Sequence, residues 1–236
     1  MISCRWRENE SGLDLVLVKG EPYLFGGARL IEVKDFFIAT RTVTRAFWAH
    51  VMGETPSIVK EYPAENVSWN ELTGPGGFFE RINESAIHEA VAREAGAGKF
   101  RLPTESEWEY AARGGPHWKD GFLYSGSNSI DEVAWYDRKH GDWTQPVGLK
   151  APNQLGIYDM SGNVWEWCED VFTRDVSQVP QDGSAYRGEG EERVLRGGCF
   201  HNWAEHCTVS KRYEIGRDYR DGCVGFRVVY SGLLFL

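Results

Sequence analysis

The stretch Gly156-Ile-Tyr-Asp-Met-Ser-Gly-Asn-Val-Trp-Glu-Trp-Cys168 decides how this chain folds. Its Gly-Asn pair at residues 162–163 favours a tight turn, and the two tryptophans that follow need a large apolar environment. A turn flanked by such side chains predicts a loop that packing holds in place.

This stretch lies within residues 115–192, which lack the sustained periodicity of a helix or a strand. Aromatic side chains recur along the segment, whereas disordered segments are poor in them. We therefore expect ordered loops, except at residues 174–192, a polar segment with three glycines that we expect to be an exposed loop. The 10 Trp and 27 Gly of the whole chain also indicate a loop-rich fold.

Regular elements are predicted at a few places only. Alternating or apolar runs predict strands at residues 13–18, 36–39, 193–196 and 226–230. Helices are predicted at residues 45–52, capped by Thr44, at 78–95, and after the capping box Thr104-Glu-Ser-Glu107. With 236 residues, 42% of them apolar, the chain is long enough for one sizeable core.

Composition excludes several classes of function. No apolar run approaches the roughly 20 residues that cross a bilayer, so no membrane span is expected. A net charge of −9 argues against a nucleic-acid partner, which needs a basic surface.

Cysteine usage does not indicate a zinc site or a dense disulfide framework. The five cysteines (Cys4, Cys168, Cys199, Cys207 and Cys223) form no CxxC pair, although the formation of one disulfide is an open alternative. The N-terminus has no apolar signal-peptide region, but Ile2-Ser3-Cys4 could be the remnant of a lipoprotein junction, with a lipid anchor on Cys4.

Two further blocks accompany the opening stretch: residues 100–115, Phe-Arg-Leu-Pro-Thr-Glu-Ser-Glu-Trp-Glu-Tyr-Ala-Ala-Arg-Gly-Gly, and Arg193-Val-Leu-Arg-Gly-Gly198 followed by Gly225-Phe-Arg-Val-Val229. In this order and spacing the blocks resemble the formylglycine-generating-enzyme (sulfatase-modifying factor) family. The resemblance implies a single α+β domain over residues 1–236, with a C-type lectin-like fold, few regular elements and long packed loops. That fold hosts both catalysts and receptors, so it does not fix the function.

The resemblance also implies a calcium site. Family enzymes bind calcium through residues that correspond here to Asp159, Gly162, Val164 and Glu166, the middle two through their carbonyls. Calcium suits such a set of oxygen ligands. The alternative is that Asp159 caps a turn and that Glu166 forms a local salt bridge.

Copper catalysis, in contrast, is not expected. Family enzymes bind Cu(I) through two cysteines five residues apart, and these positions hold Asn202 and Cys207 here. An amide cannot replace a thiolate for this soft ion. Two alternatives stay open: a repurposed pair of Cys199 with Cys207, and an iron or zinc site at His201 and His206, with or without Cys207, by analogy with related sulfoxide synthases.

The hypothesis we favour is non-enzymatic binding by a surface within residues 193–229. Residues 199–224 show no periodicity and resemble the variable region of diversity-generating retroelement proteins, which randomise the adenines of Asn codons. Trp203, Lys211 and Glu214 cannot arise from an Asn codon in this way. The residues that can, and that we predict to form the ligand-binding surface, are Cys199, His201, Asn202, His206, Tyr213, Ile215, Asp218, Tyr219, Asp221, Gly222, Cys223 and Val224.

Charge and aromatic content suggest the kind of ligand. Residues 193–227 carry seven basic and four acidic side chains, a net charge of +3, against −12 for the rest of the chain. Basic residues beside Tyr and Trp suit a protein or cell-surface ligand. The alternative use of Arg196, Arg212 and Arg227 is in buried ion pairs, which we expect for at least one of them. A receptor of this kind would work at the cell surface or outside the cell; its ligand and oligomeric state stay open.

Overall fold

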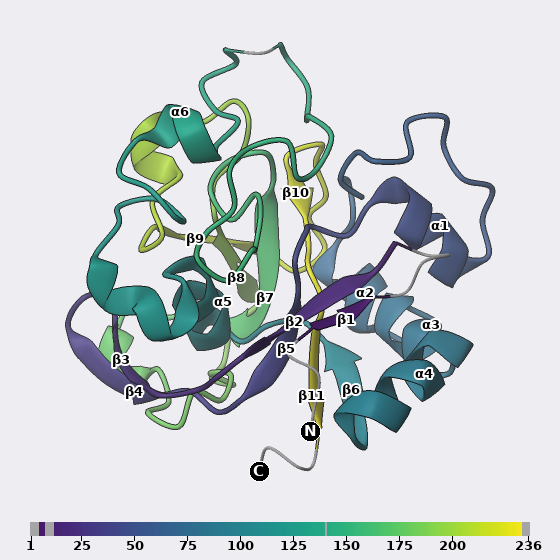
Figure 1. Cartoon of the computed structure of the whole chain (residues 1–236), viewed down its shortest axis with the longest axis horizontal. Coiled ribbons are helices and arrows are strands. Elements are labelled where there is room, and N and C mark those ends of the chain that lie inside the picture. The colour runs from purple at the N-terminus through teal and green to yellow at the C-terminus, as the bar shows by residue number, and fades with distance from the viewer. Residues whose placement is uncertain (1–4, 8–11, 140, 233–236) are drawn as a thin grey trace.

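The computed structural model describes residues 5–7, 12–139 and 141–232 (Figure 1). Its larger sheet has the strand order β1-β2-β5-β11-β6, with all neighbours antiparallel. These strands are β1 (Arg5–Arg7), β2 (Asp14–Val18), β5 (Phe36–Ala39), β6 (Gly98–Arg101) and β11 (Val229–Gly232). The C-terminal strand β11 lies between β5 and β6, so this sheet joins both ends of the described chain.

The smaller sheet carries the C-terminal region. Its order is β10-β7-β8-β9, and it comprises β7 (Trp165–Val171), β8 (Glu192–Arg196), β9 (Arg212–Gly216) and β10 (Val224–Gly225). The short strand β10 pairs parallel with β7, whereas β8 pairs antiparallel with β7 and β9. A separate hairpin is formed by β3 (Pro22–Phe25) and β4 (Arg29–Glu32).

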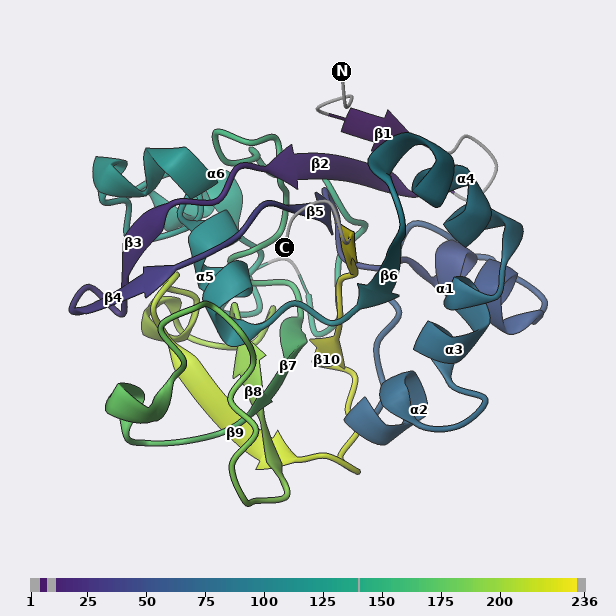
Figure 2. The ribbon, with the colours of Figure 1, turned by 90° about the horizontal axis from the view of Figure 1, so that it is seen from below.

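Helices α1 (Arg45–Met52), α2 (Trp69–Thr73), α3 (Phe78–Asn83) and α4 (Ala86–Ala95) gather on one side of the molecule, beyond β6 (Figures 1 and 2). Helix α5 (Glu105–Ala112) is buried along its whole length and contacts β3, β7 and β8. Figure 2 shows it between the hairpin and the smaller sheet. The remaining helical turns are α6 (Ile130–Val133) and the 3-10 segments η1 (Gly115–Asp120), η2 (Val176–Gln178) and η3 (Ala204–His206). No helix in the described ranges is long and apolar enough to cross a membrane.

Local capping signals predicted α1 and α5, but α2, which begins with a capping box of Ser68 and Glu71, was not predicted. Thr44 accepts a hydrogen bond from Phe47 N and begins α1, and Thr104 with Glu107 forms the predicted capping box of α5. The helix predicted at residues 78–95 is instead two helices, because Ser85 caps a new helix after α3 ends. The strand predicted at 226–230 is shifted to Val229–Gly232, and β1, β3, β4, β6, β7, β9 and β10 were not predicted.

The mixed helix and strand architecture with long loops confirms the predicted α+β class. The loops are held by packing, as expected: Trp167 has 0% of its surface exposed and donates its indole N–H to Val67 O at 2.9 Å. Asn163, also fully buried, bonds through its side chain to both N and O of Gln145. Residues 174–192 are mostly exposed, with Val179 and Ala185 anchored in the interior. The predicted lipid anchor at Cys4 lies outside the described residues.

Buried ion pairs account for much of the basic charge of residues 193–227. Arg196 is fully buried and pairs with Glu105 and Glu109, and Arg212 pairs with Glu105. Arg227 pairs with Glu166, and neither side chain is exposed. The expectation of at least one buried pair is confirmed by Arg196 and Arg227; Arg212 is half-buried, but its partner Glu105 is buried. The net charge of +3 is therefore not a property of the surface, since three of the seven basic residues neutralise internal carboxylates.

Candidate ligand-binding surface

The C-terminal region leaves the smaller sheet through two glycines that the backbone requires. Gly197 and Gly198 have φ values of 98° and 76°, in the left-handed region that favours glycine. A Cβ atom on Gly198 would lie 2.7 Å from Cys207 Sγ, too close for any side chain. The Arg-Gly-Gly motif thus turns the chain out of β8 into residues 199–202.

Backbone hydrogen bonds from distant loops hold this turn. Phe200 N donates to Asn163 O at 2.9 Å, and Asp137 N donates to Asn202 O at 2.9 Å. Further along, Arg196 donates to the carbonyls of Val209, Ser210 and Lys211. The region between the two scaffold motifs is therefore fixed by bonds to the rest of the fold.

Nine of the twelve predicted surface residues reach solvent. The exposed ones are His201, Tyr213, Asp218, Tyr219 and Gly222, and the half-buried ones are Asn202, His206, Ile215 and Asp221. Trp203, outside the predicted set, is 65% exposed.

The prediction that the other three face solvent is wrong. Val224 is 3% exposed, because it forms β10 and packs in the main hydrophobic core. Cys199 and Cys223 are 0% and 8% exposed and belong to the same core cluster. An Asn-derived codon says nothing about burial, so only the tertiary structure separates these three from their neighbours.

Contacts through Trp165 and Cys223 link Tyr213 and His201 into one face. Tyr213 stacks on Trp165, with ring centroids 5.3 Å apart, and Trp165 N donates to Cys223 O at 2.7 Å. His201 Nδ1 lies 3.1 Å from Cys223 Sγ, and Phe200 packs edge-on against the His201 ring.

Beside this face lies a cavity of about 340 Å³, whose lining includes Tyr62, Trp143, Phe200 and Gly222. Other members of the predicted set lie further out. Asp218 accepts a hydrogen bond from Asn70, and Ile215 packs against the core. His206 lies in η3.

The positions of the copper cysteines do not fit copper. Asn202 Oδ1 accepts hydrogen bonds from Cys199 N and Cys199 Sγ, both at 3.0 Å, so its side chain caps a local turn. Cys207 is fully buried in a small cluster with Tyr124 and Tyr136. Burial raises the pKa of the Cys207 thiol to about 12, which disfavours the thiolate that a metal needs.

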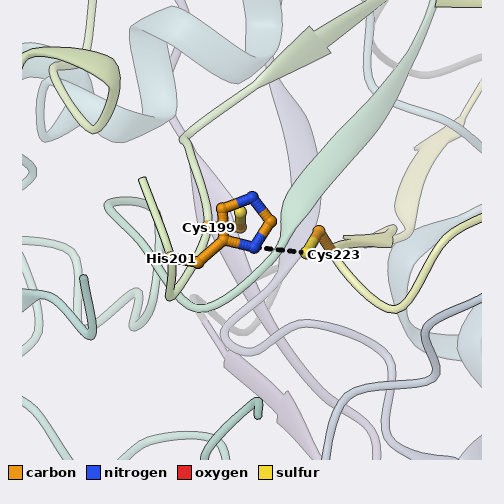
Figure 3. Close-up of side chains that lie close together, drawn as sticks. All are labelled: Cys199, His201 and Cys223. Atoms are coloured by element: carbon orange, nitrogen blue, oxygen red, sulfur yellow. Dashed lines mark hydrogen bonds between the residues drawn. The ribbon is translucent and has the colours of Figure 1, made fainter. Parts of the chain in front are cut away.

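A different cluster of metal-binding side chains is present. Among the described residues, Cys199, His201 and Cys223 bring one sulfur or nitrogen atom each to within 4.8 Å of one another. Figure 3 shows the imidazole of His201 with its nitrogen directed at the sulfur of Cys223. The sequence-based hypotheses paired Cys199 with Cys207, and His201 with His206. That Cys199 and Cys223 lie close together was not predicted from the sequence. Their positions could have indicated this, since Cys199 directly follows Arg-Gly-Gly and Cys223 shortly precedes Gly-Phe-Arg.

At the predicted calcium site, Glu166 is fully occupied by protein donors. Its Oε1 accepts from Thr42 Oγ1 at 2.8 Å and from Arg227 Nη2 at 2.8 Å. Its Oε2 accepts from Trp108 Nε1 and from Arg227 Nε, both at 2.7 Å. Four donors satisfy a carboxylate completely, so Glu166 does not fit the role of a calcium ligand in this arrangement.

Asp159 differs from Glu166 in keeping a free oxygen. It has a positive φ of 59°, and its Oδ2 accepts from Gly148 N at 2.6 Å, whereas Oδ1 is buried without a partner. Burial raises the pKa of Asp159 to about 6. Gly162 is required by its backbone, because a Cβ there would lie 2.2 Å from Trp135 O, and Val164 is buried. The resemblance predicts calcium at this block, and the four donors that surround Glu166 argue against it.

The fold and the three motif blocks define a C-type lectin-like domain of the formylglycine-generating-enzyme type. Residues 5–231 match the family model described as a sulfatase-modifying factor enzyme 1-like domain, and the chain belongs to this family. It is 38% identical over 201 residues to the chaperone protein LppX of Paenibacillus barcinonensis, covering 66% of this chain and 70% of that protein. It is 35% identical over 199 residues to the formylglycine-generating enzyme of Thermomonospora curvata, covering 72% of this chain and 63% of the relative.

Several solved structures share the whole fold. Treponema denticola variable protein 1 superposes with a TM-score of 0.78 at 24% identity, covering 95% of this chain and 97% of the other. PvdO from Pseudomonas aeruginosa superposes with a TM-score of 0.75 at 21% identity, covering 96% and 97%. At these identities the likeness concerns the fold.

Proposed function

We propose that this chain is a non-enzymatic ligand-binding protein that presents a diversified C-terminal surface on a rigid scaffold. The observation that carries the proposal is twofold. Asn202 occupies the position where family enzymes have the first copper-binding cysteine, and the side chains around it are exposed on a backbone held by hydrogen bonds. Enzymes of this family require two thiolates at positions that here hold an amide and a buried, poorly ionised thiol. The surface that remains is suited to contact rather than to redox chemistry.

The exposed residues supply the chemistry of a protein-binding surface. Tyr213, Tyr219 and Trp203 are 44%, 42% and 65% exposed, and such side chains offer large contact area at low entropic cost. The adjoining cavity adds the exposed Trp143, together with Arg45 and Glu65 from another part of the chain. We infer a protein or cell-surface ligand that covers residues 201–222 and reaches into this cavity.

The name of the structural neighbour from Treponema denticola, a variable protein, is consistent with diversification of this region. A receptor of this kind would act at the cell surface or outside the cell. The alternative function, formylglycine generation by a copper-dependent oxidase, is supported by the relative from Thermomonospora curvata and opposed by Asn202.

The proposal is tested first in the surrounding DNA. We expect a nearby near-copy of the codons for residues 193–229 that differs only at adenines, together with a reverse-transcriptase gene. Independent isolates should then differ at the codons of exposed residues such as His201 and Tyr213, and not at Trp165 or Trp167. A locus without a template copy, and with substitutions spread evenly over the chain, would contradict diversification.

The enzyme alternative is tested directly. Purified protein loaded with Cu(I) should leave the cysteine of a sulfatase-type peptide unmodified by mass spectrometry, with the Thermomonospora curvata enzyme as the positive control. Formation of formylglycine by this chain would contradict the proposal.

A further inference from the structure

Three side chains from two separate segments converge at the edge of the proposed ligand-binding face (Figure 3). Cys199 follows the Arg-Gly-Gly turn, His201 lies two residues later, and Cys223 immediately precedes β10. Their ligand atoms all lie within 4.8 Å of one another, and Cys223 Sγ is 3.1 Å from His201 Nδ1. Tetrahedral zinc with bonds of about 2.3 Å to sulfur and 2.0 Å to nitrogen places neighbouring ligand atoms about 3.5–3.8 Å apart. Small side-chain movements would therefore reach that geometry.

The backbone holds both cysteines in place before any ion binds. Cys199 N donates to Asn202 Oδ1 at 3.0 Å, and Asn202 N donates to Cys199 O at 3.0 Å. Cys223 N donates to Asp221 Oδ1 at 2.8 Å, and its carbonyl accepts from Trp165 N at 2.7 Å. The two cysteines therefore lie on segments that hydrogen bonds hold in place. Of the three side chains, only that of His201 is exposed to solvent.

The local charges suit a cation. The carboxylate of Asp221 lies against Cys223, and none of the three cluster residues is a permanent cation. A hydrogen bond from Cys223 lowers the pKa of the Cys199 thiol, and the same bond raises the pKa of Cys223. Binding of an ion would displace the protons of both thiols.

We propose that Cys199, His201 Nδ1 and Cys223 bind one Zn²⁺ ion, with the fourth coordination position open to solvent. Two sulfurs and one imidazole are a ligand set that zinc accepts, and binding releases the two thiol protons to solvent. The ion would tie the turn at residues 199–202 to the loop at 221–224, which border the same face. Its open position would be available to an oxygen or nitrogen atom of a ligand. The proposal stands independently of the proposed function.

Zinc binding is measured on the whole chain, reduced with a phosphine and stripped with a chelator. Competition with a chromophoric zinc chelator should give one equivalent of tightly bound Zn²⁺. Substitution with Co²⁺ should give thiolate-to-metal absorption in the near ultraviolet and visible bands of a tetrahedral site. Affinity should fall as pH is lowered, because protons compete for both thiolates.

Variants assign the site. His201→Ala, at an exposed position that leaves the core intact, should weaken zinc binding at least tenfold, and Cys223→Ala should abolish the thiolate absorption of Co²⁺. The matched controls are Cys207→Ala, a buried cysteine outside the cluster, and His117→Ala, an exposed histidine in η1; both should keep one equivalent.

Three results would overturn the proposal. They are the absence of stoichiometric zinc in the reduced protein, equal zinc affinity in the His201→Ala variant, and preferential binding of Cu(I) through Cys207. A disulfide between Cys199 and Cys223 that persists in reductant, seen as a loss of 2 Da, would also overturn it, since both thiolates would be consumed.

Discussion

Replacing Arg227 with Met tests whether Glu166 is held by an internal ion pair. Both side chains are 0% exposed, and two of the four hydrogen bonds that Glu166 accepts come from Arg227. Arg227 also donates to the carbonyls of Ala39 and Tyr158, which belong to other parts of the fold. The variant would leave a buried carboxylate without a counter-charge and two carbonyls without their donor.

Removing one partner of a buried pair costs about 3–5 kcal/mol, a large share of the roughly 5–15 kcal/mol that holds a domain folded. For a chain of this length the melting temperature should fall by about 6–20 °C. The matched control is Arg174→Met, whose pair with Glu214 lies at 3.4 Å with the arginine side chain 88% exposed. This control should change the free energy of unfolding by less than about 1 kcal/mol.

Thermal and urea unfolding are followed by circular dichroism for the wild type, both variants and the double variant Glu166→Leu/Arg227→Met. The double variant should recover part of the loss, because it removes both buried charges. A loss below about 1 kcal/mol for Arg227→Met would refute the ion-pair argument.

The same assay tests calcium. Because Glu166 already accepts four hydrogen bonds, we expect wild-type melting curves in excess calcium and in excess chelator to coincide. A lower melting temperature in chelator, with calcium found by elemental analysis, would instead support the predicted site at Asp159.

Three further outcomes are expected. Asp159→Asn should stabilise the protein above pH 6 by about 1–3 kcal/mol, because burial raises the pKa of Asp159 to about 6. The wild type has the full stability from the protonated carboxyl below about pH 4 and loses it as pH rises through 6. Urea unfolding is measured at pH 4.5 and 8, and no gain in stability for the variant at pH 8 would contradict this. Trp167→Ala should cost about 3–5 kcal/mol in urea unfolding, since its side chain is fully buried, and a loss below about 1 kcal/mol would contradict its role as an anchor. Tyr213→Ala should cost only about 0.5–1.5 kcal/mol, the value of its stack on Trp165, while altering ligand binding; unfolding of this variant would place Tyr213 in the scaffold.

Two helices with local capping signals, α1 and α5, were predicted from sequence, whereas α2 was not, although it has a capping box. The Thr44 cap and the Thr104-Glu107 box lie within a few residues of the backbone groups they satisfy, so α1 and α5 agree with the prediction. Strands were predicted less well: the alternating run of β9 covers only Arg212 to Ile215, and this strand forms because β8 offers a partner. The split between α3 and α4 also went unpredicted, because the apolar pattern continues across Ser85.

The sequence by itself determined the family, the α+β class and the loss of one copper cysteine, because these depend on the identity and spacing of residues along the chain. Only the tertiary structure decided that Arg227 pairs with Glu166, that Val224 is buried, and that Cys223 meets Cys199 and His201. These contacts join residues up to 61 positions apart, through a parallel β7–β10 pairing that no local pattern encodes. A side chain's role here follows from which distant segment packs against it, and that is fixed only when the whole core forms.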